Sequence, residues 1–176
     1  MQLRSEDERE QLVRAARGDI PARYARPLWI SVAPDGDEAV VVLGLNQEPY
    51  VELEEVQCRR ESGRWHAMSS SNGIGVGWTP RRWVEDGPPL GLLQLGGEVP
   101  AEVERVVVRW NDRDHELPVT AGYFFFGVWD VPEDFDDEGD YPRVVRYVRS
   151  DGTSEAVPPD PEAPRLWAWM REQRRR

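Results

Sequence analysis

The hydrophobic period of the sequence changes at about residue 27. From there on, apolar residues alternate with polar ones in short runs, and turn-forming Gly, Pro, Asn or Asp residues separate the runs. Alternation with period two places apolar side chains on one face of a strand, which is typical of antiparallel sheets. The predicted strands span residues 28–32, 38–45, 50–60, 64–70, 90–95, 105–110, 115–120, 123–131 and 143–150. We expect a mainly β fold, either an antiparallel β-sandwich or a partly open barrel.

Two helices are predicted outside this β-rich region. The first covers residues 6–17, because Ser5 and Glu8 have capping-box spacing and Gly18 supplies a stop. Its narrow apolar stripe consists of Leu12, Val13 and Ala16. A stripe of this width covers a sheet rather than forming a core alone. The second is a short amphipathic basic helix within residues 161–176, after a Pro-rich spacer.

Three strands carry more detailed predictions. In residues 104–110 one face is apolar and the other carries two arginines, so this strand is expected to be half exposed. The apolar face consists of Val106, Val108 and Trp110, and the other face of Arg105, Val107 and Arg109. Residues 123–129 are apolar on both faces, which predicts a central strand covered on both sides. In residues 50–60 the apolar positions change parity, which indicates a β-bulge near Glu54 and Glu55.

Residues 71–89 are rich in Gly, Pro and Trp and join two halves, residues 1–70 and 91–157. The second half is short for an independent sandwich of about 100 residues. We therefore expect one β-rich domain over residues 1–160 in which the halves share a core, followed by the separable tail 161–176. The glycines of the joining segment lack the strand and helix that frame a nucleotide-binding loop, and no cofactor is predicted.

The stretch ERVVVRWNDRDHELPV, followed by TAGYFFFGVW and RVVRYVRSDGT, resembles small β-sandwich modules found in many uncharacterised actinobacterial proteins. The shared pattern is a strand, a polar turn, a GYF strand and a closing DG hairpin, over about residues 91–157. The resemblance implies a fold type and a source organism, with no activity and no functional residue to transfer. Many members of that family are secreted or membrane-tethered, and the N-terminal residues here lack a secretion signal.

Charge and composition exclude several partners and chemistries. The chain has 33 Asp and Glu against 22 Lys and Arg, a net charge of -11, which opposes binding to nucleic acid or to an anionic membrane. All of these cations are Arg, which excludes lysine-based catalysis. The single cysteine excludes an intramolecular disulfide and a multi-cysteine metal site. Without an apolar signal region or a run long enough to span a membrane, a cytoplasmic location is expected.

A candidate catalytic pair comes from hairpin arithmetic. If residues 50–60 and 64–70 turn about Ser62, opposed residue numbers sum to 124 and Cys58 faces His66. A thiol beside an imidazole has the composition of an activated cysteine nucleophile, as in a small hydrolase or transferase. In the alternative interpretation Cys58 is a small buried residue and the protein is not an enzyme.

A candidate metal site lies in the acidic segment 130–140. Clustered carboxylates can hold a divalent cation, although the spacing is not that of an EF-hand loop. The predicted ligands are Asp134, Asp136, Asp137 and Asp140. A solvated charged loop is the alternative interpretation.

Eight Trp residues are many for 176 residues, and aromatic residues beside Arg are typical of protein interfaces. The predicted partner-binding residues are Arg81, Arg82, Trp83, Leu166, Trp167, Trp169 and Met170. The leading hypothesis is therefore a non-catalytic interaction protein whose partner is another protein. Its small size and acidity suit an inhibitory or immunity-like role.

Overall fold

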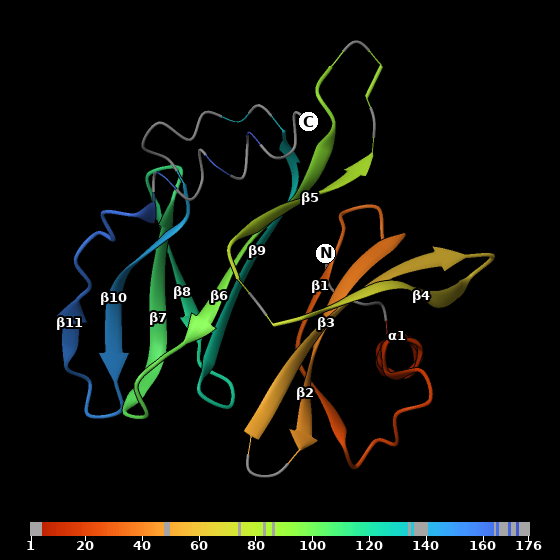
Figure 1. The fold of residues 1–176 in the computed structure, drawn as a ribbon, viewed down its shortest axis with the longest axis horizontal. Helices are drawn as coiled ribbons and strands as arrows, with labels where there is room; N and C mark the ends of the chain where they lie inside the picture. Colours follow the sequence, from red (N-terminus) through yellow and green to blue (C-terminus); the bar gives the residue numbers. More distant parts are fainter. Residues whose placement is uncertain are drawn as a thin grey trace. The chain divides into compact units, whose positions relative to one another are not determined.

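The computed structural model describes residues 5–47, 50–73, 75–82, 84–85, 87–133, 135, 141–163, 165, 169 and 172. Over these residues the structure has one named helix and eleven strands, which confirms the prediction of a mainly β fold. The chain divides into two compact units, residues 1–74 and 75–176 (Figure 1). The boundary falls inside the segment 71–89 that the sequence predicts to join the two halves.

Unit 1 is a four-stranded antiparallel sheet with one helix. The elements are α1 (Glu6–Arg17), β1 (Ala25–Val32), β2 (Glu38–Gln47), β3 (Tyr50–Glu61) and β4 (Arg64–Asn72), and the strands lie in chain order. Both ends of the helix lie where the sequence predicts them. At the first end the Ser5 hydroxyl accepts a hydrogen bond from the Glu8 amide at 3.1 Å, and at the other Gly18 follows with a φ of 54°. Local capping chemistry therefore sets both ends of α1.

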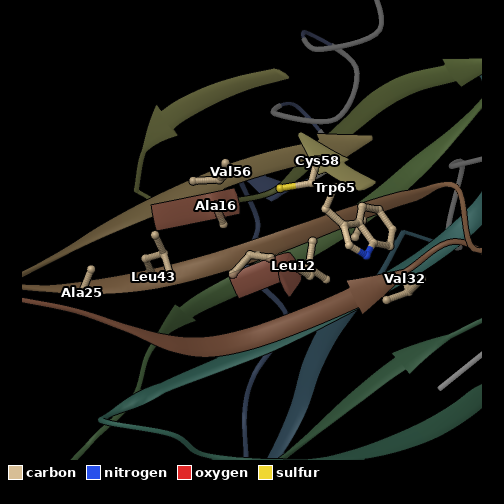
Figure 2. Close-up of a cluster of buried hydrophobic side chains, with 10 residues drawn as sticks. Leu12, Ala16, Ala25, Val32, Leu43, Val56, Cys58 and Trp65 are labelled. Atoms are coloured by element: carbon tan, nitrogen blue, oxygen red, sulfur yellow. The ribbon is translucent and has the colours of Figure 1, made fainter. Parts of the chain in front are cut away.

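Helix α1 covers one face of this sheet and forms the core of unit 1 with it. Leu12, which is fully buried, and Ala16 project from the helix toward the strands (Figure 2). The strand side of the cluster consists of Ala25, Val32, Ala39, Val41, Leu43, Val56, Cys58 and Trp65. A Leu→Ala change at such a site costs about 2 to 5 kcal/mol, so this contact is a main source of stability for the unit.

The bulge predicted near Glu54 and Glu55 is wrong. Strand β3 pairs with β2 without a register shift from residue 50 to residue 59. The apolar parity changes because β3 is buried on both faces, through Leu53 and Glu55 on one and through Val56 and Cys58 on the other. The irregularity lies instead on β4, which has one extra residue opposite the step from 57 to 58.

Unit 2 contains two antiparallel sheets. Its strands are β5 (Gly77–Arg82), β6 (Leu90–Glu98), β7 (Val103–Trp110), β8 (Arg113–Pro118), β9 (Tyr123–Pro132), β10 (Arg143–Arg149) and β11 (Ser154–Ala156). One sheet has the order β5-β6-β9 and the other β11-β10-β7-β8, and the described strands close no barrel. Val106 and Val108 of β7 share a buried cluster with Phe124 and Phe126 of β9, so residues of both sheets form one core.

The predictions for strands β9 and β7 are only partly correct. Phe124, Phe125 and Phe126 are buried, as expected for a strand covered on both sides, but β9 is an edge strand and β6 is central. In β7, Val107 is only 1% exposed although it lies on the charged face. On that face two ion pairs, Arg105–Glu116 and Arg109–Asp114, flank Val107. Arginine stems can shield an apolar neighbour while their guanidinium groups stay in water.

Most of the predicted tail 161–176 lies outside the described residues, so its helix stays a prediction. At its start, Ala163 packs against a buried cluster of unit 2 that includes Trp78 and Val131. Within the described part of the chain, no helix has the length and apolar character needed to cross a membrane.

Candidate functional site

Cys58 and His66 do not form the pair that the sequence predicts. Cys58 lies opposite Ala67 in the β3–β4 ladder, and His66 lies opposite Arg59. Because successive residues of a strand point to opposite faces, the thiol and the imidazole lie on opposite faces of the sheet. The predicted register is wrong by one residue because the loop consists of two residues, 62–63, both with positive φ.

The surroundings of Cys58 also argue against a nucleophile. Its side chain is 3% exposed and lies in the core beneath α1 (Figure 2). Burial raises the pKa of the Cys58 thiol from its ordinary value of 9.0 to about 11. A catalytic thiol needs the opposite shift, because the thiolate is the attacking species. His66 is exposed, so Cys58 is a core residue without a base beside it.

Arg81 and Arg82 both lie near Asp130, but only Arg81 is buried. The Arg81 side chain is 5% exposed, and its Nη1 donates a hydrogen bond to Oδ1 of Asp130 at 2.7 Å. Arg82 is 52% exposed, with Nη2 3.6 Å from the same oxygen. The Arg81 guanidinium also lies over the Trp129 ring, 5.7 Å from its centre. Arg81 therefore links β5 to β9 inside unit 2, and only Arg82 remains available as a surface residue.

Asp130 adopts a backbone conformation that few residues tolerate. Its φ is 59°, inside strand β9, where the register against β6 shifts. A non-glycine residue with positive φ stores strain that the surrounding structure must hold in place. The ion pair with Arg81 fixes the side chain of this residue. The sequence pattern does not predict this arrangement, whose one signal is a carboxylate within the apolar run 123–131.

Several predicted site residues lie outside the described part of the chain. They are Trp83, Leu166, Trp167 and Met170 of the partner-binding set and Asp134, Asp136, Asp137 and Asp140 of the metal set. Trp169 is described and is 57% exposed. Among the described residues, no group of three or more His, Cys, Asp or Glu side chains is placed to hold a metal ion.

The surface that fits an interaction role best is the outer edge of β4. This strand is the last of its sheet, and no described strand pairs with its outer side. Every residue of β4 except Trp65 is exposed, including Met68 at 53%. We refer to its residues 67–72, which carry no charge, as the open edge.

The direction of the hydrogen-bonding groups along the open edge follows from one bond. The amide of Gly73 donates to the carbonyl of Leu53 at 2.7 Å, so these two residues form a hydrogen-bonded pair of the ladder. In an antiparallel ladder such pairs alternate with pairs that turn their amides and carbonyls away. Ser69 and Ser71 therefore face β3, whereas Ser70 and Asn72 present their backbone groups outward. The sequence pattern does not predict the open edge, because the order of the strands in the sheet decides which strand is an edge.

Comparison of the chain with protein-family models, with curated proteins and with solved structures finds no match. The resemblance of residues 91–157 to the actinobacterial β-sandwich modules therefore stays a prediction. The described geometry is the basis for any functional proposal.

Proposed function

We propose that the chain is a non-catalytic protein-interaction module that binds an extended segment of a partner protein along the open edge of β4. The observation that carries this proposal is the exposed, uncharged stretch 67–72, whose outer side has no described strand partner. An extended segment can add to such an edge through main-chain hydrogen bonds, with side-chain contacts supplying specificity. Ser70 and Asn72 are the residues that would bond to it.

The other sheet edges of the structure carry features that discourage strand addition, and this contrast supports the proposal. Strand β1 contains Pro27, and β5 contains Pro80. Strand β11 has three residues, β8 carries the charged side chains of Asp114 and Glu116, and β9 combines a bulge with the charged Asp130 and with Pro132 at its end. Proline, charge, shortness and bulges are the usual means of protecting an edge. Within the open edge, residues 67–72, β4 has only one of these features, the bulge at Met68.

The same proposal includes finer features of the fold and the setting. We take unit 2 to be a β-sandwich, because its two sheets share one core, and residues 161–176 to contain an amphipathic helix. A cytoplasmic, inhibitory role of the immunity-protein kind agrees with the net charge of -11, which disfavours nucleic acid and anionic lipid as targets. A module of this kind would inhibit its partner by covering the segment that it binds.

A library of random twelve-residue peptides displayed on phage tests the proposal. Selection on the full-length protein is expected to enrich peptides of high β propensity. Their binding should persist in Ser70→Ala, which keeps the amide, and be lost in Ser70→Pro, which removes the outward N–H without breaking the bond to β3. Circular dichroism and a thermal melt confirm that both variants fold.

Two results would overturn the proposal. One is a folded Ser70→Pro variant that binds the enriched peptides as tightly as the wild type does. The other is a selection that enriches no peptide, or only peptides that bind unit 2.

A further inference from the structure

The open edge of β4 has three serines at its centre, Ser69 to Ser71, which match one another under two-fold symmetry. The uncharged stretch 67–73 is centred on Ser70. If two copies pair antiparallel about this residue, opposed residue numbers sum to 140, so Ser70 faces Ser70 and Ser69 faces Ser71. Met68 then lies beside Asn72 of the second copy. Because residues 67–73 carry no charge, no like charges face each other within the paired stretch.

The direction of the backbone groups agrees with this register over Ser69 to Asn72, whereas Met68, the extra residue of the β4 bulge, interrupts the regular ladder at the end of the pair. Ser70 presents its amide and carbonyl outward, so two Ser70 residues on a two-fold axis can exchange both hydrogen bonds of an antiparallel pair. The next outward-facing residue, Asn72, ends β4, and an axis there would leave most of the strand without a partner. The charged residue of β4, Arg64, is six residues from Ser70. At a rise of about 3.3 Å per residue it would lie about 20 Å from the axis, so the arginines of the two copies would not repel each other strongly.

We propose that a second copy of this chain occupies the open edge, forming a two-fold dimer in which two β4 strands pair about Ser70. The inference rests on the proposed function, because the same edge would bind the partner segment. The dimer covers the edge when no partner is present, and a partner must displace the second copy in order to bind. Association is then in competition with partner binding, which makes the dimer a regulator of the site.

The expected dimer is weak. Pairing of about three to five residues on one strand covers much less than the roughly 800 Å² per partner of a standard interface. We therefore expect a dissociation constant on the order of 10 μM or weaker. Sedimentation equilibrium of the full chain between low and high micromolar concentration measures it directly, at about 0.15 M salt so that the repulsion between two copies of net charge -11 is screened.

Charge placed on the axis tests the register. Ser70→Lys and Ser70→Asp each put like charges directly opposite one another, and each alone should weaken the dimer about tenfold or more. An equimolar mixture of the two variants should recover association, because Lys then faces Asp. The matched controls are Ser150→Lys and Ser150→Asp, which make the same charge changes on an exposed turn of unit 2.

The outcomes separate this inference from the proposed function. A wild-type protein that stays monomeric at high concentration overturns the dimer, and so does a dimer that neither Ser70 variant weakens. Phage-selected peptides that still bind such a monomer would leave the proposed function standing. Peptide binding that is absent while the dimer forms and responds to the Ser70 charges would contradict the proposed function and support the dimer.

Discussion

The indole Nε1 of Trp78 donates a buried hydrogen bond of 2.9 Å to the main-chain carbonyl of Val131. Trp78 belongs to β5 and Val131 to β9, so this bond reaches across the central strand β6. It crosses at Gly91, where a Cβ atom would lie 2.5 Å from the Trp78 ring and against the carbonyl of Thr79. The absence of a side chain at Gly91 is therefore what lets the indole reach Val131.

We predict that Gly91→Ala destabilises unit 2 by about 3 kcal/mol, because the added methyl group meets both a ring and main-chain atoms. Gly77→Ala is the matched control on β5. Its added Cβ atom would lie 4.0 Å from Cγ of Gln94, at the outer limit of van der Waals contact, so no neighbour has to move. Urea denaturation followed by tryptophan fluorescence gives both free energies of unfolding. Equal values for the two variants would show that the indole does not lie over Gly91.

The ion pair between Arg81 and Asp130 is predicted to hold the strained bulge of β9. Asp130→Asn keeps a residue that tolerates positive φ but removes the charge, and we expect it to lower the free energy of unfolding by about 1 to 3 kcal/mol. Asp130→Ala should cost about 1 kcal/mol more, because alanine also disfavours that backbone conformation. If thermal denaturation shows Asp130→Asn to be as stable as the wild type, the ion pair contributes nothing to the bulge.

Local chemistry explains which parts of the fold the sequence predicts. Helix α1 has its cap residue, its stop and its apolar stripe within one short segment, so residues 6–17 are predicted without knowledge of the rest. Strand β5 is missed because Gly77 and Pro80 resemble turn residues, whereas its pairing with β6 depends on residues eight to seventeen positions away. Pairing between distant segments overrides local propensity in sheets.

The candidate sites were harder to predict because they depend on register and strand order. The predicted Cys58–His66 pair is wrong because the observed β3–β4 register differs from the predicted one by one residue. A shift of one residue moves a side chain to the opposite face of the sheet. The Ser-Gly pair at residues 62–63 is typical of a two-residue hairpin loop, and a loop of that length predicts the observed register. The open edge of β4 has no local signal of strand order, although its lack of charge and proline is visible in the sequence.

The raised pKa of the Cys58 thiol predicts a loss of stability at alkaline pH. The thiol has a pKa of about 11 in the folded protein against an ordinary value of 9.0. Below pH 9 it is protonated in both states and contributes nothing to the pH dependence. Above pH 9 the unfolded chain loses the proton and the folded one keeps it, so the free energy of unfolding falls by about 1 kcal/mol per pH unit until about pH 11.

Comparison with Cys58→Ala isolates this contribution, because the other titrating groups are common to both proteins. The variant should be less stable at pH 8, since its core loses the sulfur, and its stability should fall less steeply between pH 9 and 10.5. Urea denaturation at each pH measures the difference. Parallel curves for the two proteins, or rapid modification of the native thiol by a disulfide reagent at pH 8, would contradict a buried Cys58.

Hydrogen exchange along β4 provides the most direct test of the open edge. The amides of Ser69 and Ser71 face β3 and should exchange slowly, whereas those of Ser70 and Asn72 face outward and should exchange at rates near those of an unfolded chain in dilute protein. At high concentration, pairing of two β4 strands should protect Ser70 and leave the exposed turn residue Ser150 unchanged. Uniform protection from 69 to 72 in dilute protein would mean that something in the same chain already covers the edge, and both proposals for it would then fail.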